Sequence, residues 1–178
     1  MSKPIDAIKK LRDYTGLSVI ECKKALEQAD YDFDKAVEIL KERGIKIAEK
    51  KADKTTGEGL IGSYIHSNGK IGVMVEVACE SDFVARTDDF KELVKNICLQ
   101  IAAASPEYIR IEDIPENLVE EKKKEYGNIE DFYKEKVLLC QNFIKDESMT
   151  IEQYIKSKIA KLGENIKVRR FTRYQLGE

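Results

Sequence analysis

The 178-residue sequence contains no tryptophan, one histidine, three prolines and only four cysteines. The cysteines are far apart and include no C-x-x-C pair, so with a single histidine they cannot form a structural zinc site of the common type. We expect reduced, mostly buried thiols. No stretch approaches the roughly 18 consecutive apolar residues of a membrane span, and the start MSKPIDAIKK lacks the apolar centre of an export signal. We therefore expect a cytoplasmic protein without a membrane partner.

Motifs of the common nucleotide-binding and catalytic sites are also missing. Neither G-x-x-x-x-G-K-[ST] nor G-x-G-x-x-G occurs, so the two common phosphate-binding loops are absent. No neighbouring motif supports a catalytic triad around His66. Adjacent acidic pairs such as Asp88-Asp89 point apart on a helix, which does not suit carboxylate catalysis. Enzyme functions are therefore poorly supported, and we predict that the chain is not an enzyme.

Charged residues are abundant but balanced, with 31 Lys and Arg against 33 Asp and Glu. The net charge of −2 argues against a protein that coats DNA, because such a protein carries a clear basic excess. Locally, residues 107–152 are acidic and residues 153–178 are basic. The hydrophobic content of 42% is enough for a packed core.

Three short helices are predicted in the first 45 residues. Apolar side chains recur at helical spacing over 5–11, 22–29 and 33–40. Helices of this length make a bundle with a very small core.

Capping signals set the limits of these helices. Ser18 and Glu21 form a capping box at the start of the second helix, and Asp32 is placed to cap the third. We expect Gly44 to end the third helix. The polar segment 46–56 either extends that helix or forms a linker.

After the three predicted helices, the spacing of apolar residues changes to the alternation typical of strands. Residues 60–66 and 70–79 are strand-like and are joined across Asn68-Gly69, which is a strong hairpin turn signal. In the second strand, alternate apolar residues predict the face toward the core: Ile71, Val73, Val75, Val77 and Cys79.

Helices and one strand complete the predicted fold. A helix starts near Asp88, two helices interrupted near Gly127 occupy 115–143, and a helix over 150–162 precedes a closing strand over 165–174. The pattern predicts an α+β fold with a small antiparallel sheet covered by helices on one face. We divide the chain into a three-helix module with linker, 1–54, and an α+β core, 55–178.

Two apolar features are open to both a structural and a functional interpretation. Ile20 lies among Lys23, Lys24 and Glu27 on the charged face of the second helix, with Val19 beside it. These residues form either a docking patch or a hydrophobic staple within the bundle.

The second feature is Phe83 in the connection 80–87 between strand and helix. A simple turn would favour Gly, Asn or Asp at such a place. Phe83 either folds inward as core or protrudes as an interaction anchor, and spacing does not distinguish the two.

At these residues the sequence resembles the bacterial elongation factor Ts family, the guanine-nucleotide exchange factors of elongation factor Tu. The matching stretches are LRDYTGLSVIECKKAL, DFDKAVEILKERG, GSYIHSNGKIGVMVEVACESDFVAR and LGENIKVRRF. The resemblance implies a UBA-like fold for the N-terminal module. The family's central motif usually begins Thr-Asp-Phe, whereas this one begins Ser81-Asp82-Phe83 and so keeps the hydroxyl. The length matches the short form of the family.

The resemblance implies a mechanism and partners. Ser81, Asp82, Phe83 and Val84 would enter the GTPase domain near the magnesium ion of the nucleotide and disturb the phosphate site. A second contact would come from the N-terminal module, through Arg12, Val19 and Ile20, with His66 as a candidate for an additional contact. The short form is expected to be a homodimer that binds two elongation factor Tu molecules, with no nucleotide, metal or nucleic acid of its own.

Two other functions compete with this one. A UBA-type module could be tethered to an unrelated enzyme. Alternatively, the chain could be an RNA-binding translation protein that uses the basic residues of its closing strand: Lys167, Arg169, Arg170 and Arg173. We favour a solvated strand, or one paired with acidic residues.

Overall fold

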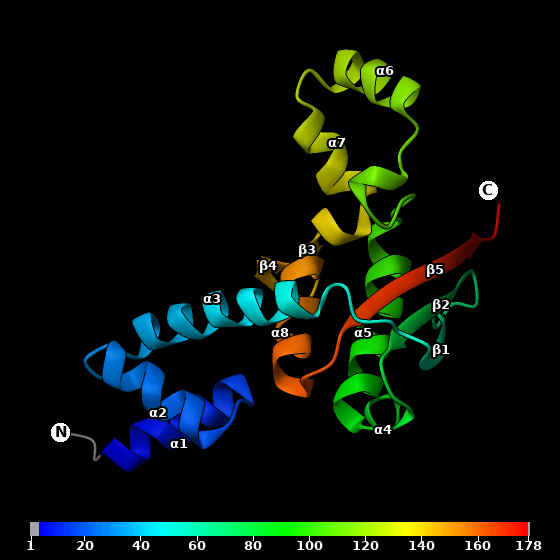
Figure 1. The fold of residues 1–178 in the computed structure, drawn as a ribbon. Helices are drawn as coiled ribbons and strands as arrows, with labels where there is room; N and C mark the ends of the chain where they lie inside the picture. Colours follow the sequence, from blue (N-terminus) through cyan, green and yellow to red (C-terminus); the bar gives the residue numbers. More distant parts are fainter. Residues whose placement is uncertain (1–3, 178) are drawn as a thin grey trace.

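The computed structural model of the chain describes residues 4–177 and has an α+β fold, as predicted (Figure 1). Its α-helices are α1 (Pro4–Thr15), α2 (Val19–Gln28), α3 (Phe33–Lys51), α4 (Asp82–Ala85), α5 (Asp88–Ala104), α6 (Glu116–Tyr126), α7 (Ile129–Lys136) and α8 (Ile151–Leu162). Its strands are β1 (Glu58–Ile65), β2 (Ile71–Cys79), β3 (Asn142–Phe143), β4 (Asp146–Thr150) and β5 (Ile166–Gln175), and two 3-10 turns are η1 (Ile111–Asp113) and η2 (Leu138–Cys140). Among the described residues, no helix has the length and apolar character needed to cross a membrane.

The first three helices form a UBA-like module whose capping residues are those predicted. The Ser18 hydroxyl accepts a hydrogen bond from the Glu21 backbone N–H at 3.2 Å, and the Glu21 carboxylate accepts one from the Ser18 N–H at 3.3 Å. Asp32 caps α3 by accepting the Lys35 N–H at 3.0 Å. Buried side chains from all three helices make the small core of the module: Leu11, Cys22, Ala25, Leu26, Ala29, Ala36 and Leu40.

The prediction that Gly44 ends the third helix is wrong, because α3 continues to Lys51. Gly44 is buried where α3 packs on α8, and a Cβ there would lie 3.4 Å from the Cβ of Ala160. Small residues at this contact let the two helix backbones approach closely, so the glycine serves packing. Ala48, further along α3, belongs to the core of the α+β part. The same helix therefore contributes to both cores.

The sheet is antiparallel with the strand order β1-β2-β5. The predicted hairpin is confirmed, with Gly69 at a φ of +69° in its turn. Val73, Val75 and Val77 of β2 point into the core, as their alternation predicts.

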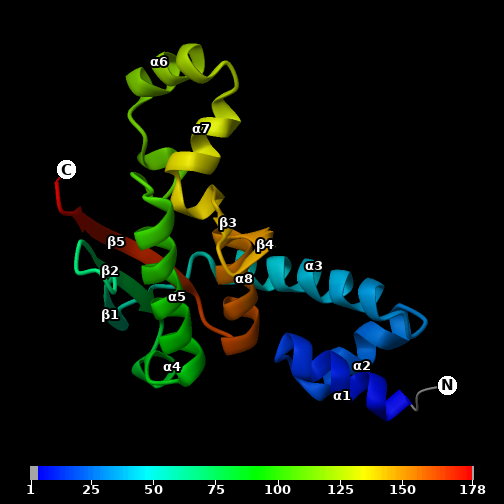
Figure 2. The ribbon, with the colours of Figure 1, turned by 180° about the vertical axis from the view of Figure 1, so that it is seen from behind.

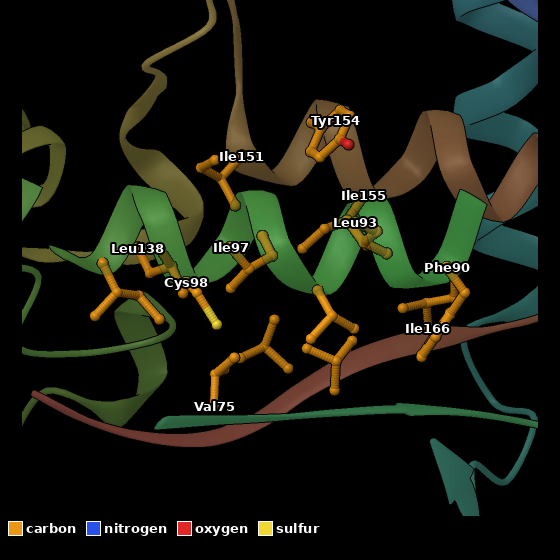
Figure 3. Close-up of a cluster of buried hydrophobic side chains, with 14 of the residues drawn as sticks. Val75, Phe90, Leu93, Ile97, Cys98, Leu138, Ile151, Tyr154, Ile155 and Ile166 are labelled. Atoms are coloured by element: carbon orange, nitrogen blue, oxygen red, sulfur yellow. The ribbon is translucent and has the colours of Figure 1, made fainter. Parts of the chain in front are cut away.

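Two helices, α5 and α8, cover one face of this sheet in successive layers (Figure 3). Side chains of α5 such as Leu93 and Ile97 lie between the strands and α8 and are fully buried. Tyr154 of α8 stacks on Phe143 with 4.4 Å between ring centroids. This layered core fixes the ends of β2 and α5, which carry the connection that contains Phe83.

Helices α6 and α7 project from the body of the molecule (Figures 1 and 2). They are separated at Gly127, as predicted, where φ is +71°. The projection has its own small core around Ile114, Phe132 and Val137. The β3–β4 hairpin that follows is not anticipated from the sequence.

Close packing of β1 on α5 leads to a stability prediction. Gly62 faces α5, and a Cβ there would overlap the Cγ1 of Val94 and lie 3.0 Å from the Cys98 Sγ. We expect Gly62→Ala to lower the free energy of unfolding by about 1–3 kcal/mol, as overpacking does. Urea denaturation followed by circular dichroism measures this. Gly57→Ala is the matched control, since no atom lies within 4 Å of its added Cβ. An equal decrease in the free energy of unfolding in Gly62→Ala and Gly57→Ala would contradict the prediction.

Candidate partner-docking site

The connection between β2 and α5 folds into the single helical turn α4 at one end of the sheet (Figure 1). The Ser81 hydroxyl caps this turn by accepting the Val84 N–H at 3.4 Å. The Thr87 hydroxyl accepts the Phe90 N–H at 3.2 Å and so begins α5. A hydroxyl residue thus stands at the start of each helix, where free backbone N–H groups need an acceptor.

Side chains of this turn point in opposite directions. Ala85 is buried and Val84 packs against the main core, whereas Phe83 is 79% exposed. The structure therefore supports a protruding Phe83 over an inward one. A large aromatic side chain held in solvent on an anchored turn has the character of an interaction anchor.

Asp82 lies beside Phe83 and forms an ion pair with Arg86, with 2.7 Å between Oδ2 and Nη2. Both side chains are substantially exposed. Exposed pairs of this kind contribute little to stability. The Asp82 carboxylate is therefore held only by one weak, exposed ion pair.

Glu164, in the turn between α8 and β5, holds the start of α4. Its carboxylate accepts hydrogen bonds from the Glu80 N–H at 3.1 Å, the Ser81 N–H at 2.9 Å and the Ser81 hydroxyl at 2.5 Å. Sequence reasoning does not single out Glu164, because helical and strand spacing carry no information about a contact so distant along the chain. The only local signal is its place directly after the helix-ending Gly163.

A reciprocal bond runs from the α8–β5 turn back to β2. The Glu80 carboxylate accepts the Asn165 N–H at 2.7 Å and lies 3.8 Å from the Lys51 ammonium at the end of α3. The buried Asn165 amide donates to the carbonyls of Ala52 at 3.1 Å and Lys54 at 2.8 Å. Three separate chain segments are thus bonded together behind the Phe83 turn.

Burial and the nearby charge of Glu164 raise the pKa of the Cys79 thiol to about 11, and burial does the same for Cys98. Both thiols therefore stay protonated at neutral pH. All four cysteines are free and three of them are buried, in agreement with the sequence prediction. Within residues 4–177, no three His, Cys, Asp or Glu side chains are grouped so as to hold a metal ion.

A second exposed apolar group lies at the start of α2. Ile20 is 65% exposed and Val19 is 50% exposed, while Leu17 packs against the core of the module. The structure therefore does not support a staple that buries Val19 or Ile20. Arg12 is exposed on α1 and lies 3.4 Å from the Asp13 carboxylate.

The predicted site residues fall into separate groups. Helices α2 and α4 lie toward the same end of the molecule with α8 between them (Figures 1 and 2). His66 lies at the other end of the β1–β2 hairpin from α4, about 25 Å away at the usual rise per strand residue. Its Nδ1 is 3.0 Å from the Tyr64 hydroxyl.

Arginines of the basic closing strand contact their own chain. Arg169 donates to the Thr56 carbonyl at 2.9 Å and to its hydroxyl at 2.7 Å. Arg170 pairs with Glu76 at 2.7 Å, and Arg173 donates to the Gln175 side chain at 2.6 Å. One of the three arginines thus pairs with an acidic residue, and the other two donate to neutral groups of their own chain.

Comparison with known proteins gives matches along nearly the whole chain. The family model described as Elongation factor TS matches residues 8–126 and 124–178. Elongation factor Ts of Coprothermobacter proteolyticus is 52% identical, with 96% of each chain covered. The protein of the same name from Thermotoga neapolitana is 47% identical over 100% of this chain and 99% of its own, and that of Heliobacterium modesticaldum is 48% identical over 96% and 88%.

Proposed function

The chain belongs to the elongation factor Ts family, and from this membership we propose that it promotes the release of GDP from elongation factor Tu during translation elongation. The observation that carries the proposal is Phe83, an exposed aromatic side chain on a turn bonded to the core. In this function the chain is an exchange factor that acts by binding, without a substrate or cofactor of its own. It works in the cytoplasm, where translation takes place.

The proposed mechanism is displacement of the metal and phosphate site. Phe83, with Asp82, inserts between helices of the partner's GTPase domain near the magnesium ion of the nucleotide, while Ser81 and Val84 hold the turn that presents them. Magnesium bridges the phosphates and neutralises their charge, so disturbing it weakens GDP binding. The effect is reciprocal, because a factor that weakens GDP binding must bind the GDP-loaded partner less tightly by the same ratio.

The N-terminal module supplies a second contact in this proposal. Arg12, Val19 and Ile20 dock on another part of the same partner, so that 1–54 and 55–178 act as two binding units. His66 is too distant from the Phe83 turn to join it and would make a separate contact. The internal contacts of the basic closing strand favour this assignment over direct nucleic-acid binding.

We also propose that the chain forms a homodimer through the open face of its sheet. Helices cover only one face in the described part of the chain (Figures 1 and 2). Exposed apolar side chains lie on the other face: Ile61, Ile65, Met74 and Tyr174. A two-fold axis would cover this face in both copies with one self-complementary patch.

The exchange activity is tested by the release of labelled GDP from elongation factor Tu with catalytic amounts of the chain. We expect the wild type to accelerate GDP release. In Phe83→Ala the accelerated release rate should fall about tenfold or more, because an aromatic anchor that becomes buried in an interface typically contributes about 2 kcal/mol or more to binding. The unfolding midpoint should stay near that of the wild type, since no core cavity is created.

Phe132→Ala is the control for a buried phenylalanine. It should lower the free energy of unfolding by about 3–5 kcal/mol while the folded fraction keeps its exchange rate. A large stability loss in Phe83→Ala with normal exchange would contradict the proposed role of Phe83. Failure of the wild type to accelerate release would refute the proposed function.

Contact through the module is tested by Ile20→Asp. We expect the affinity for elongation factor Tu to fall by about 1–2 kcal/mol, because a charge replaces an apolar interface side chain. Titration calorimetry measures the affinity, and circular dichroism of the full chain checks that its helix content is unchanged. Ile144→Asp, an exposed isoleucine beside the β3–β4 hairpin, is the matched control. Equal affinities of the two variants would exclude Ile20 from the interface.

Dimer formation is tested by light scattering under reducing conditions. We expect a mass near twice the 20.4 kDa of the chain at micromolar concentration. Met74→Glu should shift the mass toward the monomer, because it places a charge on the open sheet face, whereas Ile144→Glu should not. A monomeric wild type would remove the dimer and leave the exchange proposal intact.

A further inference from the structure

We propose that Glu164 is a positioning residue that fixes the direction of the Phe83 turn, and that elongation factor Tu therefore meets a preformed anchor. Three hydrogen bonds from Glu80 and Ser81 reach the Glu164 carboxylate, at 3.1, 2.9 and 2.5 Å. The link to GDP release rests on the function proposed above.

Phe83 needs such an anchor because its own side chain is not held. It is 79% exposed, so packing does not fix its direction and the backbone of α4 must do so. Helix α4 comprises only Asp82–Ala85, and a single turn is not stable on its own. Val84 and Ala85 anchor one side of the turn in the core. Glu164 holds its N-terminal end.

The chemistry suits a carboxylate at this position. The Glu80 and Ser81 N–H groups both point at Glu164 Oε2, and hydrogen bonds to a charged acceptor are shorter and stronger than those between neutral groups. Glu164 therefore supplies the acceptor that the end of β2 and the start of α4 lack.

Ser81 connects this carboxylate to the turn itself. Its hydroxyl donates to Glu164 Oε1 and accepts the Val84 N–H at 3.4 Å. Only a hydroxyl side chain can donate and accept in this way from one short stem. This accounts for a hydroxyl residue directly before Asp82-Phe83, whether serine or threonine.

The chain offers a direct probe, because it contains no tryptophan. In the Phe83→Trp background, fluorescence anisotropy decay reports the motion of this turn in the free, full-length chain. We expect Glu164→Ala and Ser81→Ala to raise the amplitude of local motion at least twofold. Glu164→Gln should give a smaller rise, since its amide oxygen still accepts the backbone N–H groups. Glu120→Ala, a change at an exposed glutamate on α6, should have no effect.

GDP release from elongation factor Tu, measured in chains that retain Phe83, then tests whether the fixed turn matters for exchange. We expect Glu164→Ala to lower the maximal release rate about fivefold or more, because a misplaced group loses its reactive geometry. The half-saturating concentration should change less than twofold, since the α1–α2 surface is intact. Glu164→Gln should recover part of the rate. If Glu164 only stabilises the fold, its replacement should lower the unfolding midpoint but should not lower the maximal release rate at a nearly constant half-saturating concentration.

Unchanged anisotropy in Glu164→Ala would overturn the positioning role, whatever Ser81→Ala and the exchange rates show. Increased motion with normal GDP release in Glu164→Ala would overturn its importance for exchange. If the wild type itself does not accelerate release, the proposed function fails, and the anisotropy data still decide whether Glu164 fixes the turn.

Discussion

The arrangement of the candidate docking surfaces depends on one partly buried polar junction, where the ends of α3, β2 and α8 meet. The Asn165 side chain donates to the carbonyls that follow α3, and its backbone N–H donates to the Glu80 carboxylate, while the Glu80 N–H donates to the Glu164 carboxylate. Polar groups removed from water destabilise the fold when they are unpaired. When they are paired, their hydrogen bonds fix the relative orientation of the segments that they join. An apolar contact at this place would permit sliding, because burial has no preferred direction. The junction therefore orients both the Phe83 turn and the helix that carries the N-terminal module.

Local signals in the sequence predict much of this fold, because they depend on neighbouring residues. The Ser18–Glu21 capping box and the Asp32 cap are contacts over three residues, and the alternation in β2 needs only one buried face. The direction of Phe83 could not be predicted in this way. A single helical turn is too short to show a period, so the pattern around Phe83 is compatible with both orientations.

Features that depend on distant partners escape the sequence patterns. Gly44 has the character of a helix end, yet it allows α3 to approach Ala160 of α8. Glu164 has the character of a solvated acidic residue in a turn, yet it accepts three hydrogen bonds from the end of β2. In both cases the residue type suits two environments, and tertiary contact decides between them. The short β3–β4 hairpin leaves no signal in the sequence, because β3 has only two residues and β4 is mostly polar, so neither shows a buried alternation.

Helix α3 is continuous and connects the N-terminal module to the α+β core as one rod. Its core end is fixed against α8 at Gly44, and its other end carries the two remaining helices of the module. At 1.5 Å per residue the arm from Gly44 to Phe33 is about 17 Å long, so a tilt of about 10° moves the module by about 3 Å. A partner that contacts both the module and the Phe83 turn, as proposed above, would bear on α3 between them. Bending of α3 along this arm would change the distance between the two surfaces and leave the internal structure of each intact.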